Sequence, residues 1–157
     1  MTERRVGFTV SGEKVVAVDA EVGDDGPIVV QADHTWSLQR GKREDAYHVL
    51  YQQIANYLRE HGVQRVVLKG SATTGRGGMK LAHLESAEVR GVVIAAARSV
   101  CPVRAVTKAQ VSKSFGERKV DEYVKDDAFW EEHVDGVDLR AGSREAAIML
   151  IADRAAA

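Results

Sequence analysis

Three strand-like segments follow one another at the start of the chain, with only short connections between them. They cover residues 4–10, 14–21 and 28–36, and the connections contain Ser-Gly and Gly-Asp-Asp-Gly-Pro, which are residue types of tight turns. Strands joined this closely pair as antiparallel neighbours, because a parallel pair needs a crossover of about a dozen residues or more. The first part of the sequence therefore predicts a three-stranded antiparallel meander.

Helical and strand-like patterns alternate in the rest of the chain. The predicted elements are an amphipathic helix over 43–61 that ends before Gly62, a strand over 64–70, a helix over 79–100, a strand over 102–106, and helices over 107–116, 118–134 and 143–154. Alternating strands and helices indicate parallel pairing with right-handed crossovers. We expect one α/β domain over residues 1–157, with a mixed five-stranded sheet and helices on both faces.

The composition excludes several classes of protein. The 22 basic and 23 acidic residues nearly cancel, so nucleic-acid binding would need a local basic patch. Cys101 is the only cysteine, which excludes an internal disulfide and a multi-cysteine zinc site. The N-terminal residues lack the apolar core of a signal peptide and no apolar run is long enough to span a bilayer, so we expect a cytoplasmic protein without membrane contact.

The middle of the chain carries a recognisable order of features. A strand and a loop are followed by a helix with the pair Arg90-Gly91 before an apolar run, and then by a strand and a short helix in which Lys113 precedes Gly116. This order resembles RuvC-type Holliday-junction resolvases of the RNase H-like superfamily, and the last two predicted helices extend the resemblance over most of the chain. The sequence also resembles a branch of short bacterial proteins of this fold with degenerate catalytic carboxylates.

The resemblance implies where catalytic residues would lie. RuvC-like nucleases hold two magnesium ions between carboxylates on the first strand, the fourth strand and the last helix, and such a site needs several oxygen ligands with net negative charge. The corresponding positions here are Thr9, Lys69 and Glu145, so only Glu145 keeps a carboxylate. We therefore expect no metal cofactor and a non-catalytic or weakly catalytic protein, in which the Lys69 ammonium occupies the metal position and pairs with Glu145.

Two basic segments are candidate phosphate contacts. The loop over 69–80 contains four glycines among Lys69, Arg76 and Lys80, and exposed backbone N–H groups with positive charge at the start of a helix suit a phosphate. Lys113 belongs to a second cluster with Lys108, Arg118 and Lys119. We predict that Lys69, Arg76, Lys80 and Lys113 contact DNA or RNA, with branched DNA implied by the resemblance.

Other interpretations remain open at this point. The loop over 69–80 could be an ordinary solvent-exposed loop, and an error of one residue in strand register would leave Lys69 at a strand end in solvent. An active Mg²⁺- or Mn²⁺-dependent nuclease could be rebuilt from Glu145 with Asp19, Glu85 or Glu88. A protein-interaction domain without nucleic-acid affinity is the third possibility. The apolar part of the 79–100 helix indicates burial against another helix or another subunit, and we expect a homodimer through this helix.

Overall fold

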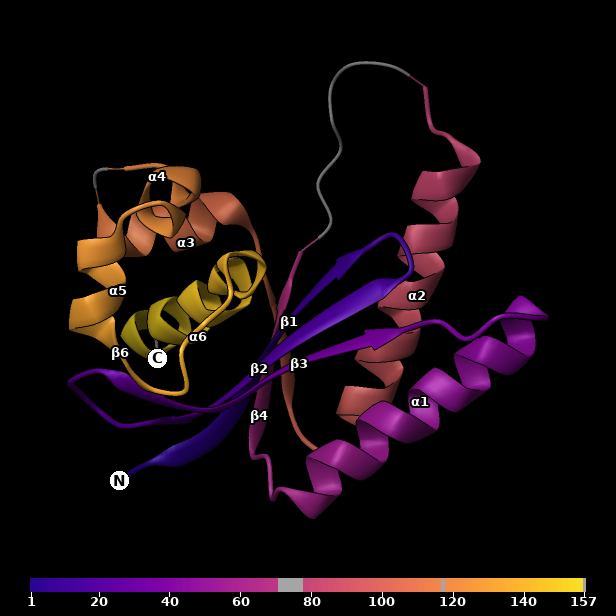
Figure 1. Cartoon of the computed structure of the whole chain (residues 1–157), viewed down its shortest axis with the longest axis horizontal. Helices are drawn as coiled ribbons and strands as arrows, with labels where there is room; N and C mark the ends of the chain where they lie inside the picture. Colours follow the sequence, from indigo (N-terminus) through magenta and orange to yellow (C-terminus); the bar gives the residue numbers. More distant parts are fainter. Residues whose placement is uncertain (71–77, 117, 157) are drawn as a thin grey trace.

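The computed structural model describes residues 1–70, 78–116 and 118–156. Its first three strands are β1 (Glu3–Ser11), β2 (Lys14–Val22) and β3 (Ile28–Ser37), and each pairs with the next in antiparallel orientation (Figure 1). The predicted meander is confirmed. The pairing of β2 with β3 shifts register between Asp19 and Ala20, which leaves one extra residue on β3.

The described sheet has six strands, in the order β5-β4-β1-β2-β3-β6. β4 (Arg65–Lys69) lies parallel to β1, and β5 (Val103–Val106) lies parallel to β4, as predicted. The prediction of five strands is wrong, because β6 (Val134–Gly136) adds a parallel edge strand beside the start of β3. Three residues are too few to produce a recognisable alternation of apolar and polar side chains.

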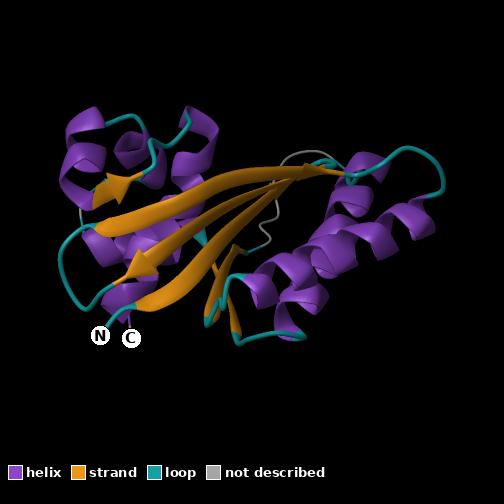
Figure 2. Ribbon diagram, turned by 60° about the horizontal axis from the view of Figure 1, so that its bottom comes forward, coloured by secondary structure: helices purple, strands orange, loops and turns teal. Residues whose placement is uncertain are grey.

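Helices cover both faces of this sheet (Figure 2). The first face carries α1 (Arg43–Glu60) and α2 (Leu81–Arg98) over one hydrophobic cluster. The second face carries α6 (Arg144–Ala156), with α3 (Lys108–Phe115), α4 (Val120–Val124) and α5 (Asp127–His133) around a second cluster. A short 3₁₀ turn, Ala141–Ser143, precedes α6. Within the described residues, no helix is both long enough and apolar enough to cross a bilayer.

The single helix predicted over 118–134 is wrong, because the structure divides this segment into α4 and α5. Asp126 lies at the division, and its carboxylate accepts a hydrogen bond from the backbone N–H of Phe129 at 3.4 Å. This cap starts a new helix in a new direction. Tyr123 on α4 and both Phe129 and Trp130 on α5 consequently reach the same hydrophobic cluster.

The predicted helix ends are confirmed in two places. Gly62 follows the end of α1 with a φ of 61°, a left-handed conformation that glycine adopts without steric cost. Thr107 caps α3, since its hydroxyl accepts a hydrogen bond from the backbone N–H of Gln110 at 3.2 Å. The buried face of α1 consists of Ala46, Leu50, Ile54, Ala55 and Leu58.

Gly7 brings α6 directly onto the sheet. A Cβ atom at this position would overlap the carbonyl oxygen of Ala146, so only glycine allows the helix to lie this close to β1. The beginning of α6 is thereby held over the end of the parallel strands β1 and β4. Glu145 is the second residue of α6 and Lys69 is the last residue of β4, so this contact brings the two together.

Candidate functional site

The predicted site residues lie at the carboxyl ends of β1 and β4, on the face that α6 covers. Gly7 contacts α6, and side chains alternate along a strand, so Thr9 points to the same face. Val67 is opposite Gly7 in the parallel register and belongs to the cluster under α6, which places Lys69 on that face as well. The structure therefore brings Thr9, Lys69 and the start of α6 to one end of the sheet.

Lys69 and Glu145 form an ion pair, as the sequence predicts. The Lys69 Nζ and Glu145 Oε1 atoms lie 2.6 Å apart, and about a third of each side chain is exposed. The Glu145 Oε1 atom is buried and, within the described parts of the chain, has the ammonium charge beside it but no hydrogen-bond donor. The side chains around the pair are largely apolar; they include Val106, Val111, Val120, Ile148 and Met149.

These residues do not fit a two-magnesium site. Thr9 offers one neutral oxygen, Lys69 is a cation, and the ammonium of Lys69 already neutralises the single carboxylate of Glu145. Within residues 1–70, 78–116 and 118–156, no three side chains of His, Cys, Asp or Glu are grouped as metal ligands. The interpretation of Lys69 as a strand end free in solvent is also wrong, since the ion pair fixes its side chain.

The other carboxylates considered for a rebuilt metal site lie away from Glu145. Asp19 is buried on the face of α1, where it accepts hydrogen bonds from Arg4 at 2.6 Å and from the Tyr57 hydroxyl at 2.7 Å. Burial raises the pKa of Tyr57, and its hydrogen bond to Asp19 raises that pKa further, so the hydroxyl remains a donor. Glu85 pairs with Arg43 at 2.7 Å, and Glu88 accepts a hydrogen bond from Tyr47 on α1.

The end of β4 is held in place by two hydrogen bonds. Arg90 Nε donates to the backbone carbonyl of Lys69 at 3.0 Å, and the backbone N–H of Gly70 donates to the carbonyl of Val106 at 2.6 Å. In the Arg90-Gly91 pair, the arginine therefore has a structural role, because it holds the end of β4. Gly91 itself is exposed, and a Cβ atom there would meet nothing within 4 Å.

A second ion pair lies beside the start of α6, and the sequence did not predict it. Arg140 donates from Nη2 to Asp33 Oδ1 at 2.7 Å and from Nε to Oδ2 at 3.0 Å, and Ser143 Oγ donates to Asp33 Oδ1 at 2.6 Å. Burial alone would raise the pKa of Asp33, but the hydrogen bonds from Arg140 and Ser143 outweigh it and hold that pKa below its usual value. Arg140 and Asp33 are 107 positions apart, so no local sequence pattern links them.

This second pair belongs to the same end of the sheet as Lys69. Thr9 pairs with Val16 and Val16 pairs with Thr35, so Thr9 and Thr35 occupy one row, two strands or about 10 Å apart. The hydroxyl of Thr35 accepts a hydrogen bond from Arg140 Nη2 at 2.8 Å. The sheet end under α6 therefore presents hydroxyl groups and two neutralised ion pairs.

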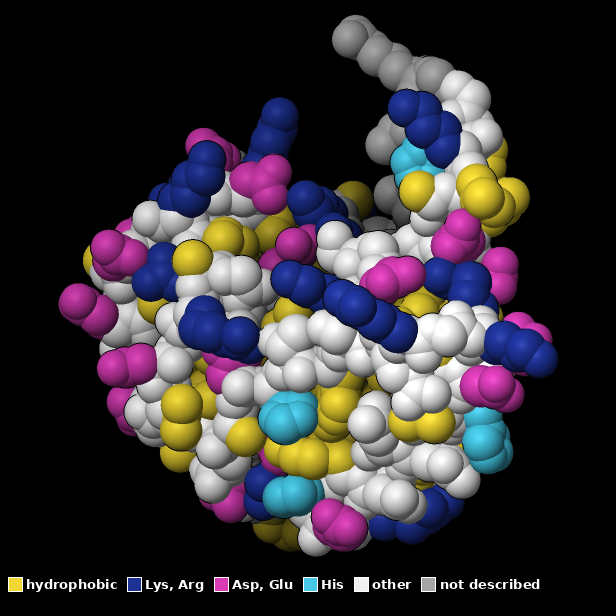
Figure 3. Space-filling model, turned by 45° about the vertical axis from the view of Figure 1, so that its right-hand side comes forward, with side chains coloured by type: hydrophobic (Ala, Val, Ile, Leu, Met, Phe, Trp, Pro, Cys, Tyr) yellow, Lys and Arg dark blue, Asp and Glu magenta, His cyan; other side chains and the backbone are white. Residues whose placement is uncertain are grey.

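The predicted phosphate contacts have different surroundings. Lys80 is exposed where α2 begins, and Lys113 is exposed on α3. Arg76 lies outside the described residues. Lys108 pairs with Asp121 at 3.2 Å and Arg118 with Asp126 at 2.7 Å, which neutralises part of the second basic cluster. Figure 3 shows Lys and Arg side chains both on the projecting end of α2 and on the part of the molecule that faces it.

Solved structures with the same arrangement of elements provide the comparison. Thermus thermophilus RuvC is 12% identical with a TM-score of 0.73, over 95% of this chain and 92% of that one. The T. thermophilus RuvC complex with a Holliday junction substrate is 10% identical with a TM-score of 0.71, over 96% and 91% of the two chains. The yeast mitochondrial Holliday junction resolvase Ydc2 is 10% identical with a TM-score of 0.64, over 98% and 78%.

Sequence comparison alone does not detect this likeness. No protein-family model matches the chain, and a search of the curated proteins finds no match. At 10–12% identity the likeness establishes the fold and not the chemistry of the site. The chain has the RNase H-like fold of RuvC and Ydc2, with a lysine–glutamate ion pair at the carboxyl end of its central parallel strands.

Proposed function

We propose that this protein binds nucleic acid and does not cleave it by a two-metal mechanism. The observation that carries the proposal is the 2.6 Å contact between Lys69 Nζ and Glu145 Oε1. The resemblance to RuvC-type resolvases implies a cation-holding carboxylate set at this place. Here the cation is supplied by the chain itself, so the start of α6 keeps its position over β4 without a bound metal.

The surroundings of the ion pair support phosphate contacts. Lys80 and Lys113 are exposed, lie on elements next to the end of β4, and form no ion pair with the acidic side chains of the described residues. We propose that these two lysines, together with Arg76 and the exposed part of Lys69, contact the phosphate backbone. Branched DNA is the proposed ligand, because the similar T. thermophilus RuvC is found with a Holliday junction substrate.

The proposal is tested by fluorescence anisotropy with a labelled four-way junction, duplex DNA and RNA across a salt series. We expect tighter binding of the junction than of the duplex, and affinity that falls as salt rises, because phosphate contacts release counterions. The samples at saturation are then incubated with Mg²⁺ or Mn²⁺ and analysed on a denaturing gel, where the strands should stay intact. Cleavage that Glu145→Gln abolishes would instead support the active nuclease.

Charge-matched variants test which surface binds. Lys80→Gln and Lys113→Gln should each weaken binding and reduce the slope of log affinity against log salt by about one. Arg59→Gln is the control, since it removes one exposed positive charge from the far end of α1. An equal loss in the control would point to general attraction, and no binding to any of the three nucleic acids would favour a protein-interaction domain.

We also propose that α2 forms a homodimer interface. The buried part of its apolar face, including Val89 and Val93, packs inside the chain against α1 and the sheet. A shallow groove between the two helices stays open to solvent; its lining includes Tyr47, Tyr51, Glu88, Gly91, Val92 and Ala95. The exposed Gly91 would allow close approach of a second copy.

The dimer is tested by the mass of the protein in solution, measured by light scattering. The wild type should be dimeric, and Ala95→Arg should be monomeric, because it places a charged side chain in the groove without filling a buried position. Ala109→Arg on α3 makes the same exposed change on the other side of the sheet and should leave the dimer intact. A monomeric wild type would refute this interface.

A further inference from the structure

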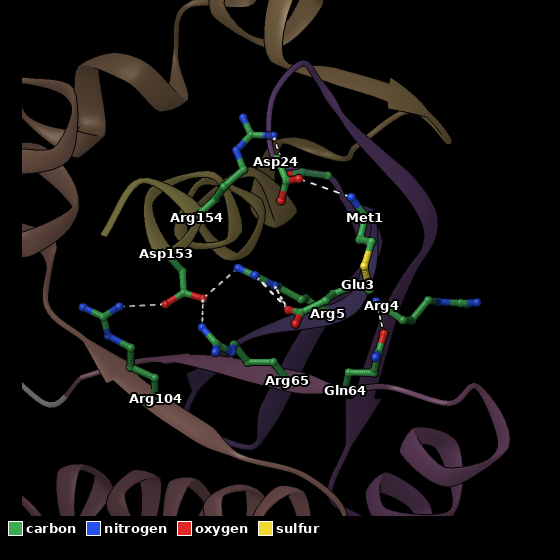
Figure 4. A network of polar contacts seen from close by, with 11 residues as sticks. Met1, Glu3, Arg4, Arg5, Asp24, Gln64, Arg65, Arg104, Asp153 and Arg154 are labelled. Atoms are coloured by element: carbon green, nitrogen blue, oxygen red, sulfur yellow. Dashed lines mark hydrogen bonds and ion pairs between the residues drawn. The ribbon is translucent and has the colours of Figure 1, made fainter. Parts of the chain in front are cut away.

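Three arginines converge on one buried carboxylate at the opposite end of the parallel strands. Asp153, on α6, is 1% exposed. Its Oδ1 accepts a hydrogen bond from Arg104 Nη1 at 2.9 Å, and its Oδ2 accepts from Arg5 Nη1 at 3.0 Å and from Arg65 Nη1 at 3.4 Å (Figure 4). The arginines come from the three adjacent strands β5, β1 and β4, so the sheet itself sets their spacing.

The three arginines of this cluster differ in burial and in the number of their acidic partners. Arg5 is buried and also pairs with Glu3: its Nε donates a hydrogen bond to Glu3 Oε2 at 2.9 Å, and its Nη2 lies 2.8 Å from the same oxygen. Among the described residues, Arg65 and Arg104 each make one polar side-chain contact, through Nη1 to Asp153, and their side chains are 34% and 42% exposed. Three positive charges thus face the two negative charges of Asp153 and Glu3 within this cluster.

The buried carboxylate also fixes the two half-exposed guanidinium groups. A guanidinium group carries five N–H donors in a rigid plane, and one contact leaves its remaining donors available. Asp153 holds the guanidinium groups of Arg65 and Arg104 through one nitrogen atom each. Little side-chain entropy is therefore lost when a second anion binds to the remaining N–H donors. Figure 4 shows the outer nitrogen atoms of Arg104 directed away from Asp153.

We propose that Arg65 and Arg104, anchored by Asp153, form a binding site for a phosphate group. Phosphate fits because its oxygens accept paired N–H donors from guanidinium groups and because an anion offsets the net positive charge of the cluster. Arg65 and Lys69 are the first and last residues of β4, which separates this site by about 13 Å along the strand from the Lys69–Glu145 pair. The site is therefore distinct from the surface proposed above for nucleic acid.

The test is isothermal titration of the full-length protein with inorganic phosphate at constant ionic strength. The wild type should bind one phosphate per chain, and Arg65→Gln and Arg104→Gln should each weaken binding at least tenfold. Both side chains are partly exposed, so these variants keep the buried Arg5–Asp153 pair and the fold. Lys42→Gln is the matched control, because it removes one exposed positive charge before the start of α1.

Two further measurements separate the sources of the phosphate group and the two proposed sites. The competitors are a dinucleotide with a 5′-phosphate and the same dinucleotide without that phosphate. Stronger competition by the first would show that the site takes a terminal phosphate. Equal competition by both would show that it takes the diester of the backbone. Lys80→Gln and Lys113→Gln should leave phosphate binding unchanged, even if they abolish nucleic-acid binding. Absence of phosphate binding in the wild type, or unchanged binding in both arginine variants, would overturn the site.

Discussion

The Nζ atom of Lys69 lies 2.6 Å from Oε1 of Glu145, where the last residue of β4 meets the first turn of α6. The contact joins two elements that the chain visits 76 positions apart, and it depends on the close approach of α6 to β1 at Gly7. The fold itself therefore places a positive charge, the Lys69 ammonium, beside the Glu145 carboxylate.

Loss of one partner should destabilise the protein more than loss of both. Lys69→Met leaves the buried Oε1 of Glu145 without its counter-charge, and we expect a decrease of about 1 kcal/mol in the free energy of unfolding, because both side chains are a third exposed and solvent screens the pair. Glu145→Gln combined with Lys69→Met should recover part of this loss. Urea denaturation of the two single variants and the double variant measures the coupling, and strictly additive changes would show that the pair contributes nothing.

Restoring carboxylates should create a cation site. Thr9→Asp with Lys69→Glu would place two new carboxylates beside Glu145, and their repulsion should lower the melting temperature in the absence of metal. Saturating Mn²⁺ should raise that temperature in this double variant, because an ion that binds only the folded state stabilises it. The wild type, and the same variant with Glu145→Gln added, should respond much less. An equal response in the wild type would contradict the geometry described for Thr9, Lys69 and Glu145.

Much of this fold can be predicted from the sequence because its signals are local. Turn residues between strands, apolar periodicity over 43–60 and the glycine after that helix each act within a few positions. The Lys69–Glu145 pair could be predicted because the resemblance assigned both positions to one site. The charges there are opposite, and burial of one charge without the other is unfavourable.

The missed features depend on contacts between distant parts of the chain. The sixth strand is only three residues long. The division between α4 and α5 follows from the Asp126 carboxylate, which caps the start of α5 at the Phe129 N–H, and from the burial of aromatic side chains of both helices. Arg5 and Asp153 are 148 positions apart, so only the packing of α6 on the sheet brings them together. Their residue types are common on protein surfaces, and nothing in their local sequence marks them as buried.

Asp33 should make stability depend on acid pH. The hydrogen bonds from Arg140 and Ser143 keep the pKa of Asp33 lower in the folded protein than its usual value of about 3.9. As the pH falls below that value, the unfolded chain binds a proton before the folded protein does. This stabilising contribution is therefore fully present above about pH 4 and is lost as the pH falls through the folded pKa.

The measurement is thermal unfolding of the wild type and Asp33→Asn between neutral and strongly acidic pH. The melting temperature of the wild type should fall more steeply below about pH 4 than that of Asp33→Asn, so that the difference between them narrows with acid. Arg140→Gln should reduce the slope as well, since it removes two of the hydrogen bonds to the carboxylate. Parallel pH profiles in all three proteins would show that Asp33 has the same proton affinity in the folded and unfolded states.

Asp153→Asn should be among the most destabilising single changes at this end of the sheet. It removes the negative charge that Arg5, Arg65 and Arg104 share, while Arg5 stays buried with only Glu3 as an acidic partner. Removing one member of a buried ion pair costs about 3 kcal/mol, because the remaining charge keeps its desolvation penalty. Arg104→Gln is the comparison, since its side chain is 42% exposed and its loss should cost less than about 1 kcal/mol. Urea denaturation measures both, and similar small losses would mean that the three arginines are accommodated by solvent and not by Asp153.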